Sequence, residues 1–133
     1  MAKRGYPTWD ISIVMNRFAE KYPDYVVKFL KAECKGIDFW LKNPAKTAEI
    51  VAKELSLPLE DATRMMKGTE MVPCSKQITA QYLGTPEKKG QFADTLHTTA
   101  AFLVEQKRLP KLLPKADFAA FLRPDYMEKA LAQ

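Results

Sequence analysis

One stretch of the chain, residues 9–14, has the pattern of a β-strand, while almost everything else predicts helices. The apolar residues Trp9, Ile11 and Ile13 alternate with polar ones, so the two-residue period of a strand places them on one face. A single strand cannot satisfy its own backbone hydrogen bonds, because each edge needs a partner. The chain is therefore either a helical domain with an incidental extended segment or one part of a larger α/β protein, and we favour the second.

Length and composition predict one folded unit over residues 1–133. The hydrophobic fraction is 47% and the charged fraction 28%, which is enough to form a core. No apolar run approaches the roughly 20 residues that a membrane-spanning helix needs, and no secretory signal follows the N-terminal charges. The net charge of +5 is compatible with nucleic acid. Because the lysines are scattered and form no block, we attribute this charge to a solvated surface.

Proline and glycine positions mark out the expected helices. Pro23 suits the first turn of a long helix that ends near residue 42, and Asn43 with Pro44 suits a cap and first turn of the next. Gly68 is placed to end a helix over residues 59–67. Further helices are expected at residues 17–22 with Asn16 as the cap, and at 75–84, 85–108, 117–122 and 124–131.

The chain offers no set of residues for covalent catalysis or for a metal or other cofactor. His97 is the only histidine, and it lies within an expected helix without a glycine-framed serine elsewhere, which favours a partly buried helical side chain. Cys34 and Cys74 lack the spacing of a zinc site. A disulfide between them is possible, while Cys34 alone has the setting of a buried thiol on a helix.

Residues 48–66 resemble a helix-turn-helix, which makes a small basic DNA-binding module the alternative function. The second helix of such a motif presents its first residues to the bases and phosphates. Here those residues are Glu60 and Asp61, whose charges repel the DNA backbone. We therefore expect no nucleic acid partner.

A specific pattern stands at the start of the chain. Residues 5–10 read Gly-x-Pro-Thr-x-Asp, a hydrophobic strand follows, and residues 18–26 read Phe-Ala-Glu-Lys-x-Pro-Asp-x-Val. With residues 43–44, 82–84 and 101–106, this pattern resembles the C-terminal part of solute-binding proteins of ABC importers, in the nitrate, sulfonate and taurine family, and its taurine-binding members in particular. The resemblance covers essentially the whole chain, but only the last part of a family member.

The resemblance implies an α/β fold of the type II periplasmic-binding-protein class, in which two lobes close over a ligand. The fragment itself is expected to be mostly α-helical with one or two strands. Residues 1–15 would form a crossing strand, and residues 16–133 would be helices that clothe the first lobe. The sheet beneath them would come from residues outside this chain. The implied partners are taurine or another alkanesulfonate and an ABC permease, and we expect a monomer in the periplasm whose signal peptide lies outside a truncated chain.

The same resemblance assigns a ligand-binding role to Asp10. In taurine-binding members the acidic residue at this place accepts hydrogen bonds from the ammonium group of the ligand, and Thr8 would be a lesser contact. Taken alone, an acidic residue at this point is either solvated or a fixed negative charge waiting for a cation. The family commonly has an aromatic residue two positions after the Asp, where Ser12 stands here.

Overall fold

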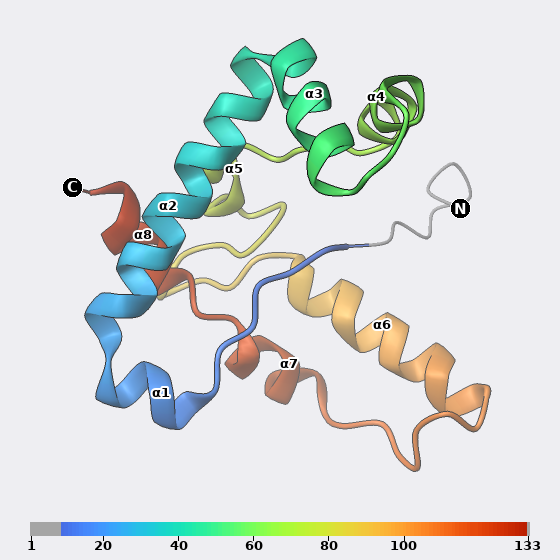
Figure 1. The fold of residues 1–133 in the computed structure, drawn as a ribbon. Helices are drawn as coiled ribbons and strands as arrows, with labels where there is room; N and C mark the ends of the chain where they lie inside the picture. The colour runs from blue at the N-terminus through green and yellow to red at the C-terminus, as the bar shows by residue number, and fades with distance from the viewer. Residues whose placement is uncertain (1–8, 133) are drawn as a thin grey trace.

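The computed structural model describes residues 9–132, and within them eight α-helices are joined by turns and loops (Figure 1). The helices are α1 (Asn16–Lys21), α2 (Pro23–Lys42), α3 (Pro44–Glu54), α4 (Leu59–Lys67), α5 (Cys74–Gln77), α6 (Phe92–Glu105), α7 (Lys115–Phe121) and α8 (Pro124–Leu131). The long helix α2 packs against α8, α1 and α3, while α3 packs on α4 and α6 on α7.

Three of these helices begin and end where the sequence predicts, namely α2, α4 and α8. Proline occupies the first turn of α2, α3 and α8, where its missing N–H costs no hydrogen bond. Asn43 is the N-cap residue of α3, as predicted, but its side chain makes no cap bond to that helix and donates instead from Nδ2 to the Phe39 carbonyl at 3.2 Å. The predicted Asn16 cap is wrong, because Asn16 is already the first residue of α1.

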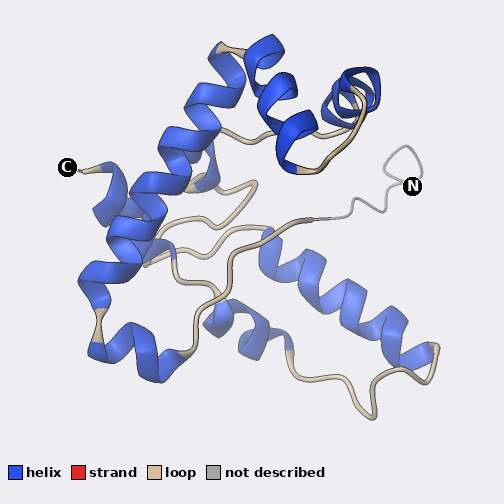
Figure 2. Cartoon of the chain, in the orientation of Figure 1, coloured by secondary structure: helices blue, strands red, loops and turns tan. Residues whose placement is uncertain are grey.

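The strand predicted over residues 9–14 is absent, and no strand occurs within residues 9–132 (Figure 2). An isolated antiparallel bridge between Gly84 and Lys89 is the one β-type pairing in that range. The physical reason is that a strand exists only by hydrogen bonding to a neighbour, and this chain supplies none to the opening segment. The expectation of one or two strands in this fragment is therefore wrong for the described part of the chain.

The region after α5 also differs from the prediction. The helix expected at residues 75–84 is only the short α5, and the one expected from residue 85 begins at Phe92. Thr85 and Pro86 do form a cap-like pattern, but it closes a turn: the Lys88 N–H donates to Thr85 Oγ1 at 3.2 Å, and the Thr85 N–H donates to the Lys88 carbonyl at 2.9 Å. Threonine followed by proline suits a tight turn as well as a helix start.

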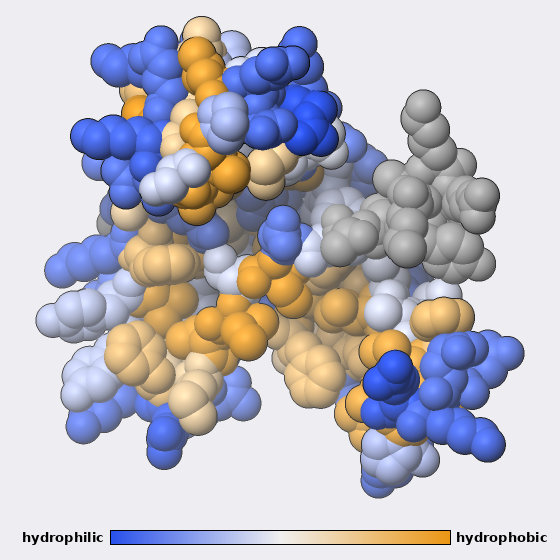
Figure 3. Space-filling model, turned by 45° about the vertical axis from the view of Figure 1, so that its right-hand side comes forward, coloured by the Kyte–Doolittle hydropathy of each residue, from blue (hydrophilic) through white to orange (hydrophobic). Residues whose placement is uncertain are grey.

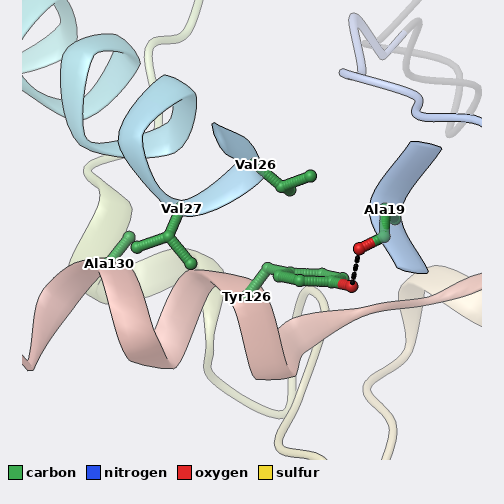
Figure 4. Packing of buried hydrophobic residues seen from close by; sticks show 5 residues of the cluster. All are labelled: Ala19, Val26, Val27, Tyr126 and Ala130. Carbon is green, nitrogen blue, oxygen red and sulfur yellow. Dashed lines mark hydrogen bonds between the residues drawn. The ribbon is translucent and has the colours of Figure 1, made fainter. Parts of the chain in front are cut away.

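The main core lies where α1, α2 and α8 meet (Figure 4). The buried side chains there are Ala19, Val26, Val27, Tyr126 and Ala130, with Leu30 packed against them. The phenol ring of Tyr126 fills the space between the helices, and its hydroxyl donates to the Ala19 carbonyl at 3.2 Å. This bond satisfies a polar atom that would otherwise be buried without a partner.

A second, smaller core joins α6 and α7. Phe92, Ala93 and Leu122 are its buried members, with Leu83, Leu96 and Ala119 around them. An exposed ion pair between Lys115 Nζ and Asp94 Oδ1, at 2.7 Å, spans the same two helices. The α6–α7 pair is thus held by its own small core, apart from the α1–α2–α8 core.

Cys34 and Cys74 form a disulfide, which the sequence had left as one of two possibilities. The Cα atoms are 5.7 Å apart, and neither cysteine is free. The bridge ties the middle of α2 to the first residue of α5, and Cys34 Sγ also lies 3.8 Å from Met127 Sδ on α8. The sulfur atoms therefore lie where α2, α5 and α8 come together.

Much hydrophobic surface remains uncovered. The chain has an accessible surface of 10303 Å², whereas a compact monomer of its mass, 15.1 kDa, would expose about 7,000 Å². The largest exposed apolar groups include Ile13, Met15, Tyr25 and Phe121, and Figure 3 shows hydrophobic side chains across the middle of one face. Surface of this kind ordinarily packs against further protein.

Candidate functional site

Asp10 lies in the opening segment, which we define as residues 9–15, between the start of the described chain and α1. Its side chain is exposed, and within residues 9–132 no hydrogen bond or ion pair reaches its carboxylate. A carboxylate without a cationic neighbour can accept hydrogen bonds from a ligand ammonium group. Thr8, the lesser predicted contact, lies outside the described residues.

Trp9 attaches the opening segment to the second core. Its indole ring meets the Tyr82 ring edge-on, with centroids 5.8 Å apart, and the Phe92 ring in the same manner at 5.5 Å. Edge-to-face contacts of this kind stabilise beyond the apolar area that they bury. The indole still keeps 38% of its surface exposed, so it rests on this platform rather than inside it.

Ser12 attaches the same segment to α2. Its hydroxyl donates to Glu33 Oε1 at 2.7 Å, a short hydrogen bond with a charged acceptor. The opening segment is therefore attached on both sides of Asp10. Trp9 contacts the loop before α6 and the first residue of that helix, and Ser12 is bonded to α2.

Two glycines shape the loop that carries Tyr82. Gly84 has a φ of +75°, and a Cβ there would collide with the Gly90 nitrogen and the Lys88 carbonyl oxygen. A Cβ on Gly90 would collide with the Tyr82 carbonyl oxygen. The close approach lets the Phe92 N–H donate to that same carbonyl at 3.1 Å, which fixes Tyr82 beside Phe92 as the platform for Trp9.

Other chemistry-bearing residues do not join this site. His97 is half-buried on α6 with its ring edge-on to Phe118, at 5.4 Å between centroids, as predicted for a helical histidine. Over residues 9–132, no cluster of three or more His, Cys, Asp or Glu side chains is arranged to hold a metal ion. In the same range, no helix combines the length and apolar character needed to cross a bilayer.

The α3–α4 pair, the basis of the DNA-binding alternative, has an acidic start to its second helix. Glu60 and Asp61 lie in the first turn of α4, and Asp61 pairs with Arg64 Nη2 at 2.6 Å. Helix α4 carries two basic side chains, Arg64 and Lys67, and the ion pair with Asp61 occupies Arg64. The surface that would face DNA is therefore poor in free positive charge.

Comparison with known proteins gives one informative match. Over 114 residues the chain is 32% identical to the taurine-binding periplasmic protein of Escherichia coli strain K12, and it is distantly homologous to that protein. The matched stretch is 80% of this chain but 33% of the relative, so the chain spans about a third of the length of the curated relative that it matches. No family model matches the chain, and no solved structure does. The relative's name describes binding in the periplasm, with no enzymatic activity, and the match gives no support to DNA binding.

Proposed function

We propose that this chain is the C-terminal part of the substrate-binding component of an ABC importer for taurine or a related aliphatic sulfonate. The observation that carries the proposal is the 32% identity, over 114 residues, to a protein named for binding taurine in the periplasm. The component would bind its ligand between two lobes, close over it by a hinge motion and deliver it to a membrane permease. It would act as a monomer and carry out no covalent chemistry.

The uncovered surface supports the domain arrangement that goes with this function. In that arrangement residues 1–15 form the crossing strand and residues 16–133 the helices that clothe the first lobe. Ile13 is 87% exposed and Ile11 is 52% exposed, although both belong to the apolar face of the strand pattern. Sheet residues from the rest of the protein would cover these side chains and pair with the backbone of the opening segment.

Asp10 is the proposed contact for the ammonium group of the ligand, with Thr8 beside it. A closed cleft would exclude water from the Asp10 carboxylate and the ligand ammonium group, which strengthens the charge-assisted hydrogen bonds between them. A sulfonate that lacks the amine would leave the carboxylate buried and unpaired, so the same residue would provide selectivity. The donors for the sulfonate end of the ligand would come from the rest of the protein.

The Cys34–Cys74 disulfide supports the periplasmic location. Disulfides persist in oxidising compartments, of which the bacterial periplasm is one, and are rare in the reducing cytosol. A chain with two cysteines and both of them in a disulfide fits that compartment.

The first test is calorimetric titration of the full-length protein with taurine, before and after the change Asp10→Asn. We expect the variant to bind roughly tenfold more weakly or worse, a loss of about 1.4 kcal/mol, because the neutral amide cannot neutralise the ammonium. Asp38→Asn is the matched control, since Asp38 is an exposed carboxylate on α2 that forms an ion pair with Lys42, at 3.8 Å between Nζ and Oδ2. Unchanged affinity in Asp10→Asn would remove Asp10 from the site, and a wild type that binds no sulfonate would remove the proposed function.

A further inference from the structure

We propose that Trp9 and Ser12 are positioning residues that together hold Asp10 in place for its ligand. Tyr82 and Phe92 contact the ring of Trp9, one residue before Asp10. Glu33 accepts a hydrogen bond from Ser12, two residues after Asp10. The proposal rests on the proposed function, because it concerns how the Asp10 carboxylate meets an ammonium group. We call these two attachments the clasp.

The clasp matters because, within residues 9–132, these two attachments are the side-chain contacts on either side of Asp10, and the proposed pairing with sheet residues from the rest of the protein would add to them. Within the described residues, the backbone groups of residues 9–14 make no hydrogen bond to other backbone groups. A chain without such bonds samples many conformations, and fixing each residue costs conformational entropy. If binding had to order Asp10 as well as contact it, this cost would be subtracted from the affinity. Attachments in the free protein remove part of that cost beforehand.

The disulfide links the two parts of the chain that supply the clasp. Glu33 directly precedes Cys34 on α2, and Cys74 opens α5, which leads into the loop that carries Tyr82. The Cys34–Cys74 bond therefore joins the helix that supplies one attachment to the segment that leads to the other. A carboxylate held from two sides of such a cross-linked frame is pre-organised for one ligand geometry.

The test compares the selectivity of variants of the full-length protein for taurine over ethanesulfonate, which has the same sulfonate but no amine. We expect Trp9→Ala and Glu33→Ala each to reduce this selectivity roughly fivefold, about 1 kcal/mol, because a mobile Asp10 meets the ammonium less often. Trp9→Phe and Glu33→Gln should stay within about twofold of the wild type, since an aromatic edge and an acceptor oxygen remain.

Selectivity separates positioning from general stability. A variant that only loosens the fold weakens taurine and ethanesulfonate equally, and that result would overturn the proposal. Unchanged selectivity in both alanine variants would also overturn it.

A ligand-independent measurement separates the clasp from the proposed function. This chain has two tryptophans, so Trp9 is the one that remains in it after Trp40→Phe. With every tryptophan elsewhere in the full-length protein also replaced by Phe, the fluorescence reports the contact of Trp9 with the platform. We expect Tyr82→Ala, and separately reduction of the disulfide, to raise quenching of Trp9 by iodide. If the wild type binds no sulfonate, the proposed function is wrong, and unchanged quenching would then show that the clasp is wrong as well.

Discussion

The helices of the α1–α2–α8 core and the strand of the opening segment were both predicted from the sequence, yet only the helices form within the described part of this chain. In the core, Tyr126 is 5% exposed and donates its hydroxyl to Ala19. In the opening segment, Ile13 is 87% exposed, and the chain is held by two side-chain attachments.

The difference follows from where each element finds its hydrogen bonds. A helix satisfies its backbone groups within its own sequence, so α2 needs neighbours only to cover its apolar stripe. An extended segment must find every backbone partner on another strand. An apolar alternation therefore predicts the shape that a segment can adopt, and its neighbours decide whether it adopts that shape.

The disulfide is expected to have the largest effect on the core side of this comparison. Removing the cross-link by Cys34→Ser with Cys74→Ser should lower the free energy of unfolding by about 4 kcal/mol, because the bond restrains a long loop in the unfolded chain; the cysteines are 40 residues apart. Urea unfolding of the full-length protein measures the loss. Reductant should destabilise the wild type and leave the double variant unchanged, and equal sensitivity of both would contradict the expectation.

Ile13 gives the sharpest test of what covers the opening segment. If sheet residues bury it in the full-length protein, Ile13→Ala should cost about 2–4 kcal/mol, the usual range for a core isoleucine. Leu55→Ala is the control, because Leu55 is an exposed aliphatic side chain in the turn after α3. A cost below about 0.5 kcal/mol for Ile13→Ala would mean that the side chain stays in solvent and the crossing-strand proposal is wrong.

Tyr126 and Tyr25 offer a matched pair within the core helices. Both follow a Pro-Asp pair at a helix start, but Tyr25 is 62% exposed and Tyr126 is buried. Tyr126→Phe leaves the Ala19 carbonyl without its bond and should cost about 1 kcal/mol, whereas Tyr25→Phe should cost almost nothing. Thermal and urea unfolding report both values, and equal costs would show that the Tyr126 bond contributes nothing.

Asp125 should give the smallest effect, and one that depends on pH. Two hydrogen bonds from Arg123, at 2.9 and 2.8 Å, hold the pKa of the Asp125 carboxyl below its ordinary value. Its contribution is therefore fully present above the unfolded-state pKa near 4 and is lost as the pH falls through the lower folded-state pKa. For a partly exposed ion pair we expect less than about 1 kcal/mol.

Unfolding of Asp125→Asn and wild type at pH 7 and at pH 2.5 measures this contribution. The two proteins should differ at pH 7, and the difference should be smaller at the lower pH. Asp24→Asn is the matched control, because Asp24 holds the same place at the start of α2 without an arginine two residues before it. A difference that stays constant with pH would exclude the Arg123 pair as its cause.

Most of the helices could be predicted from the sequence, because their signals are local. Pro23, Pro124 and Gly68 act on the residues beside them, and α2, α8 and α4 begin or end accordingly. Local signals failed after α5, where Thr85 and Pro86 suit a turn as well as a helix start. For the site, Asp10 was assigned from the resemblance to a family. Only the structure shows that no side chain within residues 9–132 pairs with its carboxylate.

The contacts between residues that are distant in the sequence depend on how the helices and loops pack. Tyr82 and Phe92 lie more than 70 positions from Trp9, and no local pattern in the sequence marks them as its partners. Cys34 and Cys74, which are 40 positions apart, and Ser12 and Glu33, which are 21 apart, are also brought together from distant parts of the sequence. Helix periodicity and turn chemistry act over a few residues, whereas the clasp around Asp10 depends on how whole helices pack, and packing is settled by the shapes of all the side chains together.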